Sequence, residues 1–207
     1  MPLPHHTQTF TIGGKQVQLL VPDASAAQEQ FREGNKPLPF WSQVWPAALG
    51  LATFLAHNTL LIREKNVVEL AAGLGLPSMF AAHYARHIVC SDYLEEATWF
   101  IGESAKLNSL TNLETRVLNW HLLPPDLEAE VVLLSDVNYE PSEFRVLHEA
   151  LQQLLQRGLC VILSTPQRLA GREFILPLLS YCRQQEVVTV PQGEGEVAVN
   201  VFVLRRQ

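Results

Sequence analysis

The stretch Val67-Val68-Glu69-Leu70-Ala71-Ala72-Gly73-Leu74-Gly75-Leu76-Pro77 decides the fold of this chain. A short β-branched apolar run ends in an acid, passes through small residues and enters the apolar run 77–82, which is the order strand, tight turn, helix. Small residues at such a turn let the backbone approach a ligand closely, and the helix start offers unpaired N–H groups. A carboxylate at Glu69 would repel a pyrophosphate. The stretch therefore favours a ligand with an amino group or a ribose and no phosphate.

A second acid lies about twenty residues further along the chain. The run Ile88-Val89-Cys90-Ser91-Asp92 is again short, apolar and closed by a carboxylate. In a strand–helix–strand unit, an acid at this position accepts hydrogen bonds from ribose hydroxyls. We therefore predict that Asp92 binds a ribose at the carboxyl end of the second strand.

Together these segments resemble the first two motifs of class I S-adenosylmethionine-dependent methyltransferases. The likeness rests on Glu-Leu-Ala-Ala-Gly-Leu-Gly-Leu-Pro at 69–77 and on Ser-Asp-Tyr at 91–93. More narrowly, residues 69–76 are similar to the motif Glu-Leu-Gly-Ala-Gly-x-Gly-Leu of the small protein-lysine methyltransferases, the branch of the methyltransferase-like 21 and nicotinamide N-methyltransferase-like proteins. Ala71 stands where that family usually has glycine. If the position requires a positive φ, alanine costs roughly 1 kcal/mol or more there.

The composition indicates one globular domain. The chain has 207 residues, of which 47% are hydrophobic and 17% charged, and no apolar run approaches the roughly 18 residues that cross a bilayer. The formal net charge is −6, and no cluster of lysine or arginine is present to neutralise phosphates, which argues against general nucleic-acid binding. A mildly acidic surface suits a basic protein or peptide as substrate. We expect a monomer with no membrane attachment.

The cysteines and histidines suggest neither disulfides nor a metal. Cys90, Cys160 and Cys182 lie far apart in apolar runs, so we expect buried free thiols in a reducing cytoplasm. The first residues show no basic, apolar leader, so we expect no secretion signal and a cytoplasmic protein. His83 and His87 have a zinc-like spacing, but no third ligand accompanies them, so we predict no metal site.

Residues 1–38 are predicted to form an accessory segment before the main domain, residues 39–207. Residues 9–21 alternate apolar and polar side chains on both sides of Gly13-Gly14, which predicts a β-hairpin outside the main sheet. A polar helix is expected over residues 24–33, and residues 34–37 break it. This helix is either a plain surface helix or a mobile arm that faces the substrate.

An aromatic-rich segment leads into the next helix. Trp41 and Trp45 precede Pro46, and an apolar helix follows to about Leu55. Filling the core is one interpretation of both tryptophans. In the resembling family the pattern Trp-x-Ala-Ala-x-x-Leu-Ala-x-x-Leu comes before the glycine-rich turn, and its tryptophan lies against the cofactor. The resemblance therefore implies that Trp45 lines the cofactor pocket.

Apolar strands and helices alternate through the rest of the chain. We predict helices over 94–108, with Leu107 on the inner face, over 142–157 and over 171–182, and strands over 113–118, 129–136, 159–164, 186–190 and 197–204. The loop 191–195 is short, so the last two strands run antiparallel. The fold class is α/β: as in the resembling family, a Rossmann-like seven-stranded mixed sheet with helices on both faces and an antiparallel last strand, plus the N-terminal hairpin and helix.

Two further strand ends carry candidate residues. Trp120 follows the third strand, where an aromatic ring can stack on adenine, and the resembling family has a tryptophan there. The fourth strand ends in Ser-Asp-Val-Asn-Tyr at 135–139, which matches the Asp-x-x-Tyr pattern of the lysine-methylating branch. It does not match the Asn/Asp-Pro-Pro-Tyr/Phe/Trp turn with which amino-methylating enzymes of bases and glutamine hold their substrates. Methylation of DNA, RNA or release factors is therefore disfavoured.

The resemblance implies S-adenosylmethionine as the cofactor, with S-adenosylhomocysteine as its product. Asp136 would orient the incoming amine by a hydrogen bond, and Tyr139 would wall its channel. Glu69 would serve the polar end of the cofactor or the turn around it. A role as the cap of the following helix is the alternative for Asp136. The predicted catalytic residues are Asp136 and Tyr139, and the predicted cofactor-binding residues are Trp45, Glu69, Ala71, Gly73, Gly75, Asp92, Trp120 and Ser135.

Methyl transfer to a protein lysine is the function that the resemblance favours. Such an in-line displacement needs a neutral amine, no water and good alignment, which contributes up to roughly 7–11 kcal/mol. A small-molecule N-methyltransferase is an alternative, because the first 45 residues specify no substrate. Another is a cofactor-binding but catalytically silent interaction protein, which Ala71 suggests. A nucleotide-dependent dehydrogenase is disfavoured, because Glu69 disfavours a pyrophosphate and Gly-x-Gly-x-x-Gly is absent.

Overall fold

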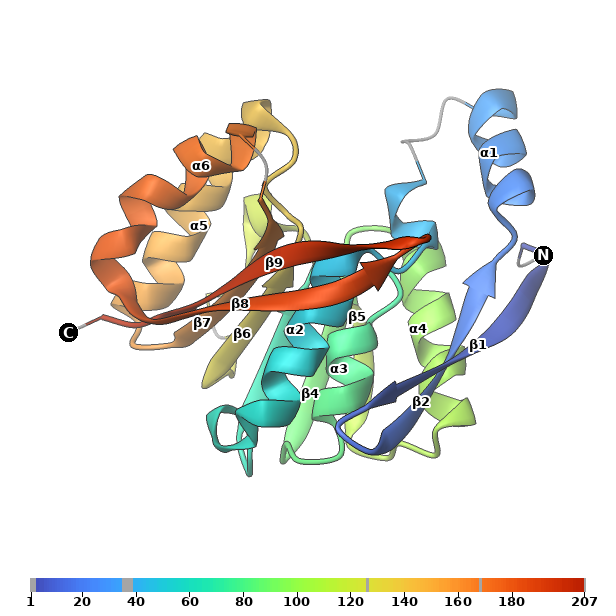
Figure 1. Ribbon diagram of the computed structural model, residues 1–207, viewed down its shortest axis with the longest axis horizontal. Helices are drawn as coiled ribbons and strands as arrows, with labels where there is room; N and C mark the ends of the chain where they lie inside the picture. The colour runs from blue at the N-terminus through green and yellow to red at the C-terminus, as the bar shows by residue number, and fades with distance from the viewer. Residues whose placement is uncertain (1–2, 35–38, 126, 168, 207) are drawn as a thin grey trace.

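The computed structural model describes residues 3–34, 39–125, 127–167 and 169–206. Its centre is a seven-stranded mixed sheet in the order β5-β4-β3-β6-β7-β9-β8 (Figure 1). The strands are β3 Asn66–Leu70, β4 His87–Asp92, β5 Leu113–Val117, β6 Val131–Ser135, β7 Cys160–Pro166, β8 Cys182–Gln192 and β9 Gly195–Leu204. Neighbours from β5 to β7 are parallel, and β9 lies antiparallel between β7 and β8. The predicted Rossmann-like sheet with a reversed final strand is confirmed.

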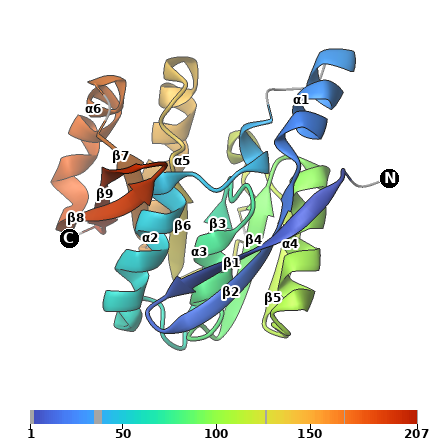
Figure 2. The same cartoon turned by 45° about the vertical axis from the view of Figure 1, so that its right-hand side comes forward.

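Helices cover both faces of this sheet (Figures 1 and 2). One face carries α2 Pro46–His57, α3 Leu76–Ala81 and α4 Glu95–Leu107, and the other carries α5 Phe144–Gln156 and α6 Leu169–Ile175. Short 3-10 helices are η1 Phe40–Ser42, η2 Thr59–Leu61, η3 Trp120–Leu122, η4 Pro141–Glu143 and η5 Leu176–Tyr181. The sheet thus has a separate apolar core on each side.

The side chains of strand β6 show why the sheet lies between two layers of helices. Val131 and Leu133 face the core of α2, α3 and α4, whereas Val132 and Leu134 face the core of α5 and α6. All four side chains are fully buried. A parallel strand covered on both faces has a continuous apolar sequence, which is the pattern that predicted it.

The predicted N-terminal hairpin consists of β1 His5–Ile12 and β2 Lys15–Pro22, which form a separate two-stranded sheet. Figure 2 shows this hairpin lying across the helices on one side of the main sheet. The helix α1 follows over Ala24–Glu33, as predicted. Most of the predicted break at 34–37 lies outside the described residues, and the division at residue 38 stays a prediction.

The hairpin is attached to the main domain by hydrogen bonds and by burial. The backbone N–H of Leu20 donates to the Ser104 hydroxyl on α4 at 3.0 Å, and that of Gln18 donates to the side-chain oxygen of Asn108, the C-cap of α4, at 2.9 Å. The inward side chains of β2, including Leu19, are buried in the same core as α2, α3 and α4. The two-stranded sheet therefore extends the core that lies beneath these helices.

Two predicted elements near the carboxyl end are wrong in extent. In place of one helix over 171–182, the α-helix ends at Ile175 and the 3-10 helix η5 follows. Pro177 explains the change, because proline lacks an N–H and clashes with the preceding turn. Strand β8 begins at Cys182 rather than at Glu186, because pairing with β9 extends the strand through polar residues that carry no strand signal of their own.

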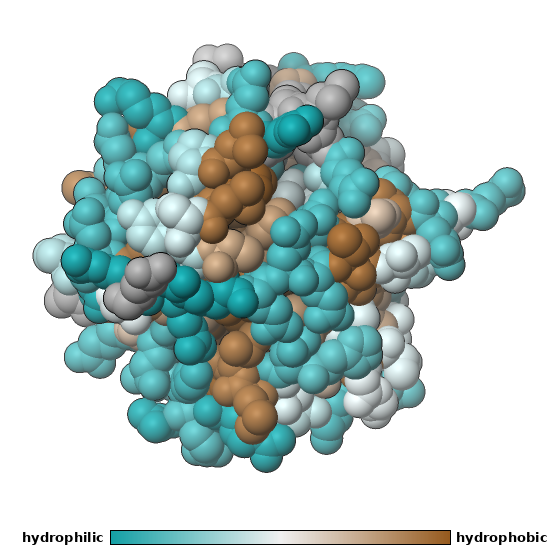
Figure 3. Space-filling view, turned by 60° about the vertical axis from the view of Figure 1, so that its left-hand side comes forward, coloured by the Kyte–Doolittle hydropathy of each residue, from teal (hydrophilic) through white to brown (hydrophobic). Residues whose placement is uncertain are grey.

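Some side chains differ from the sequence expectations. Leu107, which we predicted on the inner face of α4, is 45% exposed, and Phe100 is fully buried on this helix instead. Cys90 and Cys160 are buried free thiols as predicted, whereas Cys182 is only partly buried. The face in Figure 3 is mostly hydrophilic, with hydrophobic residues in a few separate patches. Within the described ranges, no helix is both long enough and apolar enough to span a membrane.

Candidate active site

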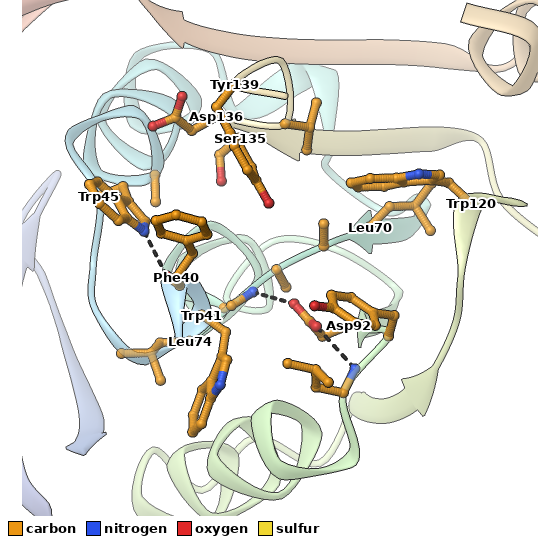
Figure 4. Close-up of a pocket in the computed structure, with 18 of the residues that line it drawn as sticks. Phe40, Trp41, Trp45, Leu70, Leu74, Asp92, Trp120, Ser135, Asp136 and Tyr139 are labelled. Atoms are coloured by element: carbon orange, nitrogen blue, oxygen red, sulfur yellow. Dashed lines mark hydrogen bonds between the residues drawn. The ribbon is translucent and has the colours of Figure 1, made fainter. Parts of the chain in front are cut away.

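A cavity of about 630 Å³ opens at the carboxyl ends of β3, β4 and β6 (Figure 4). Open α/β sheets bind their ligands at this edge. The wall combines the segment before α2, the turn between β3 and α3, the end of β4, and the segments after β5 and β6. All the predicted site residues line this cavity except Glu69. The fold thus brings together side chains that are far apart in the sequence.

The turn between β3 and α3 depends on positive φ angles. The φ angle is 51° at Ala71, 57° at Gly73 and 73° at Gly75. A Cβ atom on Gly75 would lie 2.8 Å from the Sγ atom of Cys90, so only glycine fits there without a shift. Ala71 adopts the left-handed conformation, so an alanine at this position carries the cost in free energy that a positive φ imposes on L-amino acids.

Glu69 lies beneath this turn, outside the cavity. Its side chain is fully buried, and its Oε2 atom accepts a hydrogen bond from the backbone N–H of Ser78 on α3 at 2.9 Å. Burial raises the pKa of the Glu69 carboxyl to about 8, although hydrogen bonds from Ser78 oppose the rise. The carboxyl is therefore mostly neutral at neutral pH. The predicted repulsion of a pyrophosphate by Glu69 is therefore wrong, because it requires a charge that burial removes.

Asp92 closes β4 and holds the same turn from the cavity side. Its Oδ2 atom accepts a hydrogen bond from the N–H of Gly73 at 3.0 Å, and its Oδ1 atom accepts one from Leu94 at 3.2 Å (Figure 4). Burial raises the pKa of Asp92, and these backbone hydrogen bonds oppose the rise. A carboxylate has about four lone-pair sites, so Asp92 keeps acceptor capacity for hydroxyl groups of a ligand.

Aromatic side chains from distant segments form another part of the wall. The rings of Phe40 and Tyr139 meet edge to face with centroids 5.3 Å apart, and those of Phe40 and Trp45 are 6.2 Å apart (Figure 4). The indole N–H of Trp45 donates to the carbonyl of Phe40 at 2.7 Å. Phe40 is 42% exposed and Tyr139 is 45% exposed, so these rings border the mouth of the cavity.

Trp41 is buried in the core, as one interpretation of the sequence predicted. It lines the cavity, and its ring also packs against Phe100 of α4 with centroids 5.4 Å apart. Phe40 is a cavity residue that the sequence analysis did not select. Its neighbours Trp45 and Tyr139 carried the resemblance, whereas no local pattern distinguishes Phe40 from a core residue.

Asp136 follows β6 in an uncommon backbone conformation. Its φ angle is 54°, in the left-handed region, and its backbone N–H donates to the carbonyl of Ser164 on β7 at 2.9 Å. The residue is 8% exposed and borders the cavity. The N-caps of the next two helices are Glu140 and Glu143, so the alternative role of Asp136 as a helix cap is wrong. Strained residues of this kind cluster at ligand sites.

Glu143 joins two parts of the cavity wall. Its Oε2 atom accepts a hydrogen bond from the indole N–H of Trp120 at 3.1 Å and lies 2.6 Å from Nε2 of His121. These contacts, that of Trp120 first, lower the pKa of the Glu143 carboxyl. Glu143 belongs to η4 in the segment after β6, whereas the other two residues follow β5. No sequence pattern distinguishes Glu143 or His121 from ordinary surface residues.

Carboxyl groups dominate the charged side chains around the cavity. Asp92, Asp136, Glu140 and Glu143 border it, and His121 is the basic side chain among the described lining residues. Such a wall favours a cationic or neutral ligand over an anion. Across the part of the chain that the structure describes, no group of three or more His, Cys, Asp and Glu side chains is placed to hold a metal ion.

Comparison with known proteins identifies the family. The model of the Methyltransf_16 family, described as lysine methyltransferase, matches residues 33–179. The histone-arginine methyltransferase METTL23 of Xenopus laevis is 31% identical over 120 residues, which are 55% of this chain and 51% of that protein. Human METTL23 is 27% identical over 72% of this chain and 81% of its own length. The protein-lysine N-methyltransferase EFM3 of Chaetomium thermophilum is 28% identical over 73% of this chain and 49% of its length. The chain thus spans about half the length of the Xenopus and Chaetomium relatives.

Solved structures share the fold at low sequence identity. Protein PH1948 of Pyrococcus horikoshii superimposes with a TM-score of 0.63 at 14% identity, covering 89% of this chain and 99% of that one. An S-adenosylmethionine-dependent O-methyltransferase of Thermotoga maritima gives 0.58 at 11% identity, covering 97% and 78%. These identities establish the fold alone. The family match, which covers more than half of the chain, shows that the protein belongs to the Methyltransf_16 family.

Proposed function

We propose that this protein transfers a methyl group from S-adenosylmethionine to a lysine side chain of a protein substrate. The observation that carries the proposal is the buried residue Asp136, which borders the cavity together with Trp45 and Tyr139 (Figure 4). A hydrogen-bond acceptor next to apolar rings suits an amine that has to lose its water and a proton before it reacts. The family description and the names of relatives that act on proteins support a protein substrate.

The residues around the cavity fit the parts of the cofactor. A volume of about 630 Å³ is within the usual range of ligand pockets, about 300–1,000 Å³. Asp92 would accept hydrogen bonds from the ribose hydroxyls, and Trp120 would stack on the adenine. Trp45, Ser135 and the backbone of residues 71–75 would border the methionine part. When bound, S-adenosylmethionine supplies an electrophilic methyl group on a sulfonium.

Glu69 would act on the cofactor only through the turn. Its neutral, buried carboxyl group on β3 accepts a hydrogen bond from the first turn of α3. This contact holds the intervening turn, which borders the cavity, in position. Of the two roles that we predicted for Glu69, support of the turn is the one that its burial favours.

The remaining groups would prepare the amine. A lysine with a pKa near 10.4 is mostly protonated at neutral pH, so the neutral form has to be selected. The rings of Phe40, Trp45 and Tyr139 would exclude water and disfavour the charged form, and the released proton would leave through the open mouth. Asp136 would accept a hydrogen bond from the nitrogen and so orient its lone pair. Burial raises the pKa of the Tyr139 hydroxyl, which therefore stays a hydrogen-bond donor.

Arginine is the second candidate target, because four relatives are histone-arginine methyltransferases. A guanidinium presents five N–H donors in a planar fork and stays charged, so it is held best by several acceptors. In the segment 136–143, Asp136 is buried, but Glu140 is exposed. One buried acceptor suits an amine better than a guanidinium, and we therefore place lysine first.

The test is transfer of a labelled methyl group from S-adenosylmethionine into an extract, followed by mass spectrometry of the labelled residue. We expect methyllysine in one or a few proteins. Detection of methylarginine instead would show that arginine is the target residue. Label only in small molecules would refute a protein substrate, and binding of the cofactor without any transfer would favour the silent interaction protein.

The variant Asp136→Asn tests the catalytic assignment. Asparagine has the same size and tolerates a left-handed backbone, so the fold should persist. We expect a loss of kcat of about 100-fold, because asparagine replaces the carboxylate with a neutral amide whose NH2 group cannot accept a hydrogen bond from the amine. The Kd for S-adenosylhomocysteine, measured by calorimetry, should change little. An equal loss of binding and turnover would contradict the assignment.

A further inference from the structure

We infer that Glu143 is a positioning residue that fixes Trp120 against the cavity and so connects the cofactor side of the cavity to the segment that carries Asp136. Its Oε2 atom accepts the indole N–H of Trp120 at 3.1 Å. The inference rests on the proposed function, because it assigns Trp120 to the nucleoside part of the cofactor. It adds a residue that makes no predicted contact with the cofactor itself.

Trp120 needs such a contact because its own segment is loosely held. It follows β5, which is the edge strand of the sheet and is exposed at Thr115, Arg116 and Val117. Between β5 and β6, the described residues contain the short helix η3 and no α-helix. Leu122 of η3 is 85% exposed. Packing on one side, where Trp120 contacts the core of α5, does not by itself fix the rotation of the ring.

The hydrogen bond supplies the missing restraint. The indole N–H is a donor only, and a carboxylate acceptor makes the bond charge-assisted and directional. One edge of the ring is therefore held at Glu143 (Oε2), while the ring lies at the border of the cavity near Leu70 (Figure 4). The same oxygen lies 2.6 Å from Nε2 of His121. Two neighbouring side chains of η3 thus meet one carboxylate.

The position of Glu143 in the chain gives the contact a second consequence. Glu143 is in η4, and the segment from Asp136 to Glu143 borders the cavity with Tyr139 and Glu140 as well. A displacement of this segment would therefore move the acceptor of Trp120. The structure connects the wall predicted to hold adenine with the wall predicted to hold the amine through one side chain.

Two substitutions at Glu143 should weaken cofactor binding in a fixed order. Glu143→Ala removes both hydrogen bonds, so we expect the Kd for S-adenosylhomocysteine to rise about tenfold. Glu143→Gln keeps an oxygen acceptor for the indole and loses the charge, so we expect a rise of about threefold. Glu149→Gln is the matched control, because Glu149 lies on α5 in an exposed pair with Arg145. Binding should be unchanged in this control, and Tm should be similar in all three variants.

A double-mutant cycle with Trp120→Phe separates positioning from general stability. Phenylalanine keeps an aromatic ring but has no N–H, so Glu143 has no indole to hold. In this background Glu143→Gln should cause no further loss of affinity. Additive losses, or unchanged affinity in Glu143→Ala, would overturn the inference. If the unsubstituted protein does not bind S-adenosylhomocysteine, the proposed function fails instead, so the two failures are distinguishable.

Discussion

Ala71 and Asp136 both adopt a left-handed backbone conformation beside the cavity, with φ angles of 51° and 54°. L-amino acids lose roughly 1–2 kcal/mol in this conformation. The two residues follow β3 and β6, the neighbouring strands at the centre of the sheet. Two of the four non-glycine residues with a positive φ in the described ranges thus lie where the chain leaves the sheet to form the ligand wall, a place where retained strain can have a functional cause.

Ala71→Gly tests this strain. Glycine removes the left-handed cost of roughly 1–2 kcal/mol, while its greater freedom in the unfolded chain offsets roughly 0.5–1 kcal/mol. We expect a net gain in the free energy of unfolding of about 0.5–1 kcal/mol, measured by urea denaturation, and a changed Kd for S-adenosylhomocysteine.

Ser109→Gly is the matched control for that variant. Ser109 has a φ angle of 53°, is exposed at the end of α4 and does not line the cavity. It should gain similar stability with no change in cofactor affinity. A loss of stability in Ala71→Gly would show that the alanine methyl group packs better than its backbone strain costs.

Glu69 makes stability depend on pH. Its folded-state pKa of about 8 lies above the ordinary 4.5, so the folded chain keeps a proton that the unfolded chain loses. The contribution of Glu69 to the free energy of unfolding should therefore be greatest below about pH 4.5. It should fall by about 1 kcal/mol per pH unit between about pH 4.5 and pH 8. Asp92, whose pKa is also raised, acts in the same direction. Denaturation between about pH 5 and pH 8 should show a smaller slope in Glu69→Gln, and equal slopes would contradict the raised pKa.

The residues of the site were predictable to the extent that a local pattern marks them. Ala71, Asp92 and Asp136 stand at strand ends in recognisable motifs, and the fold places them at one cavity. Phe40 and Glu143 were not predictable, because their contacts join segments far apart in the chain. Sequence patterns also suggested a charged Glu69, since they do not report how deeply a strand end is buried.

Among the elements, α2 shows how closely a helix approaches the sheet. A Cβ atom on Gly50 would lie 2.8 Å from the Cβ and Cγ1 atoms of Val199 on β9. In contrast, a Cβ atom on Gly102 of α4 would lie 3.8 Å from the side chain of Thr115, an ordinary contact. Both glycines are inside helices, so alanine should gain the same helix propensity at either position. A difference in stability between the two alanine variants would therefore report the effect of packing.

Alanine at these two positions should have opposite effects. Gly102→Ala should raise the free energy of unfolding by about 0.5–1 kcal/mol through helix propensity. Gly50→Ala gains the same propensity but overpacks against Val199, which costs roughly 1–3 kcal/mol, so it should destabilise the protein. Thermal and urea denaturation measure both. Stabilisation by Gly50→Ala would mean that α2 can move away from β9 at little cost.

Elements were predictable where sequence and burial agree. The apolar runs of β3, β4, β6 and β7 identified the buried parallel strands. The start of β8 at Cys182 was not predictable, because its exposed polar residues become a strand only by pairing with β9. The change from α6 to η5 has a local cause in Pro177, which our prediction of one continuous helix did not take into account.

At the scale of the whole molecule, the N-terminal hairpin and the main domain share one apolar core. Asn108, the C-cap residue of α4, fixes this attachment. Its Oδ1 atom accepts the N–H of Gln18 at 2.9 Å, and its Nδ2 group donates to the carbonyls of Gln18 and Ser104 at 2.6 and 2.7 Å. We expect the hairpin to unfold together with the sheet.

Asn108→Ala tests that coupling. Loss of the amide leaves the backbone groups of Gln18 unpaired, which should lower the free energy of unfolding by about 1–3 kcal/mol. Far-UV and near-UV circular dichroism should still report one coincident transition. Gln8→Ala on the exposed side of β1 should change little. Two separate transitions would show instead that the hairpin is an independent unit, as the predicted boundary at residue 38 implies.

The position of β9 between β7 and β8 also constrains how the chain can fold. β8 precedes β9 in the sequence, yet within the described sheet β9 is its only partner. The two strands are joined by a short turn, so they can pair locally and dock on β7 as a hairpin. Until they do, the open edge of β7, whose seven residues are all buried in the native sheet, is exposed to other chains. Aggregation during refolding should thus depend on how fast this last hairpin docks.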